Sequence, residues 1–213
     1  YVRGDAYGIN NFVDNGDSTV TDHATGLTWI KDDNGSGVLW GDALSYCDGL
    51  TLAGMDDWRL PNIKELHSIV DYSQSPALDP IFSATVITNE AEQSDYAFYW
   101  SSTTHIGYPS KLSEAAYISF GRGMGNMAEF GGWIDVHGAG AQRSDDKSGV
   151  PVGDEQGHGP QGDARRSFNY VRCVRGGQAQ PSNGADPSTL TLSTGSIAPP
   201  QGGNSRQSNN SQP

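Results

Sequence analysis

The residues that could bind a metal or take part in catalysis are concentrated in a glycine-rich stretch between positions 135 and 163. The candidate metal ligands in this stretch are Asp135, His137, Asp145, Asp146, His158 and Asp163. Carboxylates crowded in one loop repel one another, so a bound cation or a partner would be needed to order them. Ca²⁺ suits oxygen ligands from aspartate, glutamate and backbone carbonyls, whereas histidine favours zinc or a structural hydrogen bond.

The spacing of these residues matches no compact ligand motif, so three interpretations of the stretch stay open. It could hold a structural cation, for which Ca²⁺ is the candidate cofactor, or it could be ordered by its own hydrogen bonds or by a partner. It could also be a catalytic site. From 135 to 166 the chain has almost no apolar residues and no period. We therefore expect an irregular loop, and a loop of this length in a compact domain is usually functional or locally held.

A second possible chemistry involves His105, which follows the hydroxyl-rich run Ser101-Ser102-Thr103-Thr104. A histidine near a serine could act as a general base. However, no Gly-x-Ser-x-Gly turn accompanies it, and that turn is what exposes a nucleophilic serine in many hydrolases. The surface end of a strand is the better interpretation of His105.

Aromatic residues could supply a binding surface for a glycan or for a host or matrix protein, because their rings offer rigid contact area. They include the cluster between Tyr96 and Trp100 together with Tyr108, Tyr117 and Trp133. Alternation along a strand sends about half of such side chains inward, so Trp100 is expected in the core. Tyr108, in a Gly-Tyr-Pro sequence, and Trp133 are the candidate surface residues.

Composition limits the possible partners. The chain has 213 residues and a net charge of −12. That charge argues against nucleic acid, whose phosphates need clustered lysine and arginine. The chain contains no apolar run of the roughly 18 residues that a membrane span needs. Its 28 glycines, 13 basic residues and two distant cysteines fit an exported protein with one disulfide.

The elements that must position these residues begin with a hairpin over 9–31. Strands at 9–13 and 19–30 flank Asp14-Asn15-Gly16-Asp17, which supplies turn residues. Apolar residues recur at helical spacing between Trp40 and Leu50, which predicts a first helix. Strands are expected at 96–104, 115–120 and 168–175, and 121–132 is expected to be a loop or bulged hairpin.

A second helix is expected from the sequence Trp58-Arg59-Leu60-Pro61-Asn62 onward. Asn62 and Glu65 have the spacing of a capping box, in which each side chain bonds the backbone amide of the other. Ile63, Leu66, Ile69 and Val70 form one apolar stripe, so we expect this helix to run to about Tyr72 with one face buried.

Four ordered motifs resemble a family of exported bacterial domains whose best-known member is the C-terminal domain of a collagen-like adhesin. They are residues 22–29, 57–61, 99–103 and 170–175. The Arg-Leu-Pro turn into the second helix also resembles C-type-lectin-like folds, including the formylglycine-generating-enzyme type. The resemblance implies an α+β fold with two helices against short twisted antiparallel sheets and long irregular loops. It also implies an extracellular or bacterial cell-surface location.

In C-type-lectin-like folds a disulfide joins the first helix to the last strand, so the resemblance implies a Cys47–Cys173 bond. The alternative is two reduced core cysteines. The calcium-dependent sugar motifs Glu-Pro-Asn and Trp-Asn-Asp are absent. The formylglycine-generating chemistry uses a pair of thiols, and both thiols here are assigned to the disulfide. We therefore expect a non-enzymatic binding or assembly module, with a metal-dependent enzyme using residues 135–163 as the alternative.

The sequence divides into a domain at 1–177 and a tail at 178–213. The tail is rich in serine, glycine, asparagine and proline, which is typical of a linker. Its one strand-like segment is 189–193, where Leu190 and Leu192 share a face. Such a segment could add to the sheet edge of another copy, so a homo-oligomer or filament is the expected partner arrangement.

Overall fold

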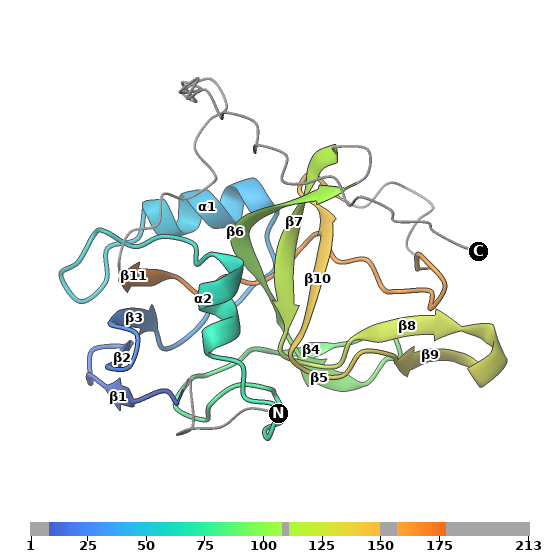
Figure 1. The fold of residues 1–213 in the computed structure, drawn as a ribbon, viewed down its shortest axis with the longest axis horizontal. Helices are drawn as coiled ribbons and strands as arrows, with labels where there is room; N and C mark the ends of the chain where they lie inside the picture. Colours follow the sequence, from blue (N-terminus) through green and yellow to red (C-terminus); the bar gives the residue numbers. More distant parts are fainter. Residues whose placement is uncertain (1–8, 108–110, 150–156, 178–213) are drawn as a thin grey trace, which may run out of the picture.

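The computed structural model describes residues 9–107, 111–149 and 157–177, and these form an α+β fold of small antiparallel sheets and two helices (Figure 1). The coarse fold class is as predicted. The tail segment 189–193, with Leu190 and Leu192, lies outside the described residues, as does Tyr108. No helix in the described part of the chain is long and apolar enough to cross a membrane.

The first sheet has four strands in the order β1-β2-β3-β11, all antiparallel. Its strands are β1 (Phe12–Asp14), β2 (Thr19–Asp22), β3 (Leu27–Ile30) and β11 (Val174–Gly176). The prediction of one strand over 19–30 was wrong. Asp22 accepts hydrogen bonds from the Ala24 amide and the Thr25 hydroxyl, and this turn divides the segment into β2 and β3.

The two helices are α1 (Trp40–Asp48) and α2 (Ile63–Ser68). The predicted capping box is confirmed, because Asn62 Oδ1 accepts from the Glu65 amide and Glu65 Oε2 accepts from the Asn62 amide. Helix α2 ends four residues before the predicted Tyr72. Val70 instead pairs with Leu78 in a β-bridge, so the chain turns away from the helix.

The second sheet has the order β10-β7-β6, with β6 (Phe98–Gly107), β7 (Lys111–Ser119) and β10 (Ala141–Asp146). Strand β10 corrects the prediction of an irregular loop over 135–166. It has no apolar alternation because its one buried residue is polar: Asp145 accepts from the Tyr117 hydroxyl at 2.7 Å. Hydrophobic period alone could not reveal such a strand.

Two hairpins complete the fold. One consists of β4 (Val86–Thr88) and β5 (Ser94–Tyr96). The other consists of β8 (Met124–Met127) and β9 (Gly132–Asp135), joined by the 3₁₀ turn η1 (Ala128–Phe130). The final strand is shorter than predicted, because Asn169 and Tyr170 make isolated bridges to Val38 and Tyr99.

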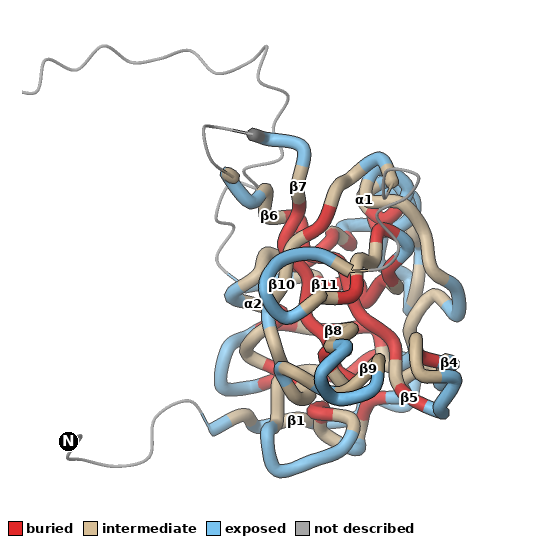
Figure 2. Tube along the Cα trace, turned by 90° about the vertical axis from the view of Figure 1, so that its right-hand side faces the viewer, coloured by how far each residue is buried: buried red, intermediate tan, exposed pale blue. Residues whose placement is uncertain are grey.

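The core consists of two apolar clusters that run through the centre of the molecule (Figure 2). Helix α2 contributes Leu66 to the first, where it meets Trp29 and Tyr99. Helix α1 contributes Cys47 to the second, with Trp100. Trp100 is fully buried, as predicted. Cys47 and Cys173 form the disulfide that the resemblance implied, and it ties α1 to the segment that leads into β11.

Candidate binding site

The six predicted metal ligands are distributed over separate elements. Asp135 Oδ1 accepts from the amides of Gly123 and Gly138. His137 Nε2 lies 2.8 Å from Asp163 Oδ1. The other Asp163 carboxylate oxygen lies 3.3 Å from Arg143 Nη2. These interactions join the end of the β8–β9 hairpin to the loop after residue 157.

The remaining candidate ligands also have protein partners. Asp145 is buried and accepts from Tyr117 and from the Arg166 amide. Asp146 accepts from Ser148, and His158 contacts Asp163 through the main chain. Across the described residues, no three histidine, cysteine or acidic side chains lie close enough to hold a metal ion. The described residues therefore do not assemble the predicted Ca²⁺ site.

The other predicted site residues lie in different surroundings. Trp133 is half-buried on β9 opposite Asn126. His105 Nδ1 lies 3.0 Å from both Glu114 Oε2 and Ser144 Oγ on the exposed end of β6. Ser101, which precedes it, is buried and donates to the Ala116 carbonyl. The serine run and His105 therefore do not form a catalytic pair.

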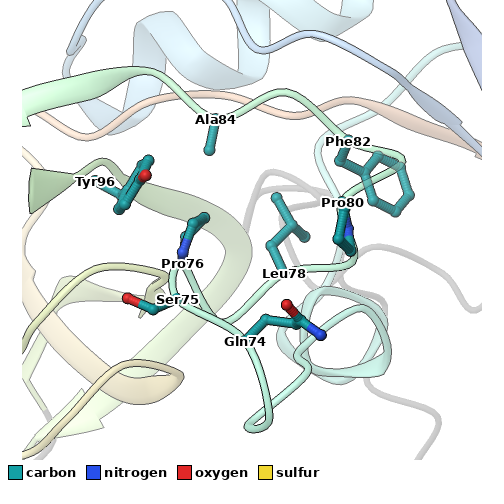
Figure 3. A pocket seen from close by; sticks show the side chains of 8 residues that line it. All are labelled: Gln74, Ser75, Pro76, Leu78, Pro80, Phe82, Ala84 and Tyr96. Carbon is teal, nitrogen blue, oxygen red and sulfur yellow. The ribbon is translucent and has the colours of Figure 1, made fainter.

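A pocket of about 250 Å³ lies between the segment that follows α2 and the β4–β5 hairpin (Figure 3). Its lining residues are Gln74, Ser75, Pro76, Leu78, Pro80, Phe82, Ala84 and Tyr96. Ala84 points into the space between Tyr96 and Leu78 (Figure 3). Apolar walls with a few polar groups are typical of sites that bind a small ligand or a single side chain.

One wall of the pocket is fixed by Phe82 and the buried Arg172. The Phe82 ring packs edge-on against Phe12 at 5.1 Å, and the Arg172 guanidinium lies 5.1 Å from the Phe82 ring centre. Arg172 also donates to the Ser83 carbonyl and, at 2.9 Å, to the Ile30 carbonyl. The guanidinium thereby connects this wall to the first sheet.

The opposite wall is held by a second buried polar group, Asp95. This carboxylate accepts from the Asn89 side chain and from the amide and guanidinium of Arg122. It also accepts from the amide of Tyr96. Tyr96 therefore lies on a hairpin whose geometry is fixed before any ligand binds.

The segment that carries the prolines is anchored by main-chain bonds. Ala77 donates to the Phe120 carbonyl and accepts from the Asp71 amide. Pro76 follows a cis peptide bond. These contacts attach the segment to the end of β7 and to the end of α2, so the pocket is preformed.

The polar groups of the pocket are available to a ligand. Within the described residues, the side chains of Gln74 and Ser75 and the hydroxyl of Tyr96 make no hydrogen bond to protein. Gln74 and Ser75 are exposed, and Tyr96 is half-buried. An amide, a hydroxyl and a phenol at the mouth of an apolar pocket can fix the orientation of what enters it.

Sequence reasoning missed this pocket. Residues 73–80 are interrupted by two prolines and 81–95 have weak periodicity, so neither stretch predicted a wall. The available signal was Leu78, between the two prolines, and Phe82 and Ala84, which follow the second proline. Which of them share one cavity depends on contacts made by the distant Arg172 and Asp95.

Fold and site together define a small α+β domain with one helix joined by a disulfide to its C-terminal segment and with a preformed apolar pocket. The chain belongs to the Lcl C-terminal domain family, whose model matches residues 18–133. The matched region contains every residue that lines the pocket. No curated protein and no solved structure shows significant similarity to this chain.

Proposed function

We propose that this protein is an extracellular, non-enzymatic binding module of the adhesion type, and that the pocket between Gln74 and Tyr96 is its recognition site. Membership of the Lcl C-terminal domain family supports an adhesion-related role at or outside the cell surface. The Cys47–Cys173 disulfide supports an oxidising compartment, because such bonds are rare in the cytosol.

The observation that carries this proposal is that hydrogen bonds hold both walls of the pocket, while its polar side-chain groups have no partner among the described residues. Ligands gain affinity when a site needs no rearrangement, since no ordering entropy is lost on binding. Buried Arg172 and buried Asp95 fix the two walls. The Tyr96 hydroxyl and the Gln74 amide have no partner in the part of the chain that the structure describes, so they can recognise a ligand.

A role as a filament subunit, through Leu190 and Leu192 of the tail, stays a prediction because both residues lie outside the described part of the chain. Bound Ca²⁺ also stays a prediction, although the six candidate ligands lie apart, and metal analysis of the purified protein would test it. Stoichiometric zinc or copper would instead favour the alternative of a metal-dependent enzyme.

The test of the recognition site uses a variant that fills the pocket. Ala84→Leu adds bulk where Ala84 points into the cavity, and Ala128→Leu makes the same change on the exposed η1 turn. The full chain and both variants are applied to glycan and protein arrays after their melting temperatures are compared. We expect targets that bind the wild type and Ala128→Leu to be lost with Ala84→Leu. If folded Ala84→Leu keeps every target, the pocket is not the recognition site.

A further inference from the structure

Strand β4 has one edge that no described residue covers. The β4–β5 hairpin is a two-stranded sheet, so β5 pairs with only one side of β4. Val86 is 59% exposed and Thr88 is exposed as well. Figure 2 shows β4 at the margin of the molecule.

The direction of the backbone groups follows from the pairing. Thr85 accepts from the Ala97 amide and Asn89 donates to the Gln93 carbonyl, so residues 85 and 89 bond toward β5. Backbone groups alternate in direction along a strand. The amides and carbonyls of Val86 and Thr88 therefore point away from β5. An edge of this kind is a template for an added strand.

The open edge adjoins the pocket. Side chains alternate between the two faces of a strand, so Ala84 and Val86 lie on one face of this segment. Tyr96, the cross-strand partner of Val86, shares that face. Because Ala84 and Tyr96 both line the pocket, a strand added at β4 would direct alternate side chains toward the pocket side.

The segment beside the pocket carries two negatively charged side chains, Asp71 and Asp79. Asp79 lies between the lining residues Leu78 and Pro80, and its carboxylate accepts from the Ile81 amide. Asp71 precedes Gln74, and hydrogen bonds from the hydroxyl and amide of Ser73 hold the pKa of Asp71 below its ordinary range.

Neither aspartate makes an ion pair with any described residue, and the whole chain carries a net charge of −12. A ligand with lysine or arginine beside its apolar group therefore complements this site, because opposite charges steer and orient association.

We propose that β4 and the pocket bind an extended peptide segment of a partner protein, in which an apolar side chain next to a lysine or arginine enters the pocket. The peptide pairs with the outer edge of β4 through the main-chain groups of Val86 and Thr88. This inference rests on the proposed role of the pocket as the recognition site. The hydrogen bonds of the edge supply affinity, and the pocket supplies specificity.

The test uses short synthetic peptides in which a central Val, Leu or Pro is flanked by Lys, by Ser or by Glu. Binding to the full chain is measured by calorimetry at low and at physiological salt. We expect Lys-flanked peptides to bind about tenfold more tightly than Glu-flanked ones, with a smaller difference at higher salt. Equal binding of both sets would overturn the charge assignment.

Three variants separate the contribution of the strand edge from that of the two aspartates. Val86→Pro removes one outward amide at a position where an edge strand tolerates proline, whereas Val86→Ala keeps that amide. We expect about a tenfold loss of peptide affinity with proline and little change with alanine. The Asp71→Asn and Asp79→Asn double variant keeps side-chain oxygens that accept from Ser73 and from the Ile81 amide, but it removes both negative charges. It should abolish the preference for lysine.

If Val86→Pro does not fold, amide hydrogen exchange in the wild type tests the pairing of the peptide with the edge of β4. The amides of Val86 and Thr88 should exchange rapidly alone and slowly with a Lys-flanked peptide, and unchanged exchange in bound protein would overturn the edge pairing. If no peptide binds while Ala84→Leu still removes glycan targets, the peptide inference fails and the pocket keeps its role. If Ala84→Leu removes no target, the proposed function itself fails.

Discussion

The Tyr99 hydroxyl donates to Asp33 Oδ2 at 2.5 Å and thereby joins strand β6 to the loop that follows β3. Asp33 also accepts from the amide and hydroxyl of Thr85, the residue immediately before β4. Burial raises the pKa of Tyr99 above its ordinary range, so the phenol keeps its proton and remains a donor. The Asp33 carboxylate thus anchors both strand β6 of the second sheet and the segment before β4, which contributes Ala84 to the pocket.

We predict that Asp33 makes stability fall in acid. Burial alone would raise its pKa, but hydrogen bonds from Thr85, Tyr99 and Gly35 outweigh it and hold the pKa of Asp33 below 3.8. A group whose pKa is lower in the folded state stabilises fully above its unfolded value, and this stabilisation is lost as the pH falls through the folded value.

The measurement is the free energy of unfolding as a function of pH for the wild type and Asp33→Asn. We expect the variant to be less stable at neutral pH and to lose less stability between about pH 4 and pH 2. Parallel curves for the two proteins would show that Asp33 has no depressed pKa.

The Cys47–Cys173 disulfide should contribute strongly to stability, because it closes a loop with a sequence separation of 126 residues. We expect replacement of both cysteines by alanine to lower the free energy of unfolding by about 2–5 kcal/mol. Urea denaturation of the oxidised wild type, the reduced wild type and the double variant measures this. The reduced wild type and the variant should agree closely, and equal stability of all three would contradict the prediction.

Arg172 should be among the most sensitive positions in the chain. It is fully buried and donates to the carbonyls of Ile30, Lys31 and Ser83. Arg172→Met leaves these acceptors without a donor, at roughly 1–3 kcal/mol for each that stays dry. We expect an overall loss of about 3–5 kcal/mol by chemical denaturation. Arg172→Lys keeps the charge but loses the fork of donors, so we expect an intermediate loss in the free energy of unfolding. An Arg172→Met variant as stable as the wild type would refute this role.

The parts of the fold that the sequence predicted are those encoded locally. Asn62 and Glu65 are three residues apart and form the capping box, and the apolar spacing after Trp40 gives α1. Strand β10 and the pocket depend on contacts distant in sequence. Asp145 is buried because it meets Tyr117, and Phe82 is positioned by Arg172. Neither pair has a local signature, which is why the strand at 141–146 was missed within the predicted irregular stretch 135–166, and why the pocket was missed.

Tyr96 should matter for binding and not for stability. In the described part of the chain its hydroxyl has no hydrogen-bond partner, so Tyr96→Phe should change the free energy of unfolding by less than about 0.5 kcal/mol. Affinity for a ligand that bonds the phenol should fall about 2- to 10-fold, the usual net value of one hydrogen bond. Calorimetry and thermal unfolding of the same samples measure both quantities. A destabilised variant with unchanged affinity would show that the hydroxyl stabilises the fold and does not contact the ligand.

The most direct test of the pocket as the recognition site is a methyl NMR titration of the full chain with the tightest ligand found on the arrays. Leu78 and Ala84 line the pocket, while Ala128 lies on the exposed η1 turn of the β8–β9 hairpin. We predict that the methyl signals of Leu78 and Ala84 shift in proportion to occupancy while the Ala128 signal stays in place. Shifts confined to Ala128 or to other residues outside the pocket, with Leu78 and Ala84 unchanged at saturation, would contradict it.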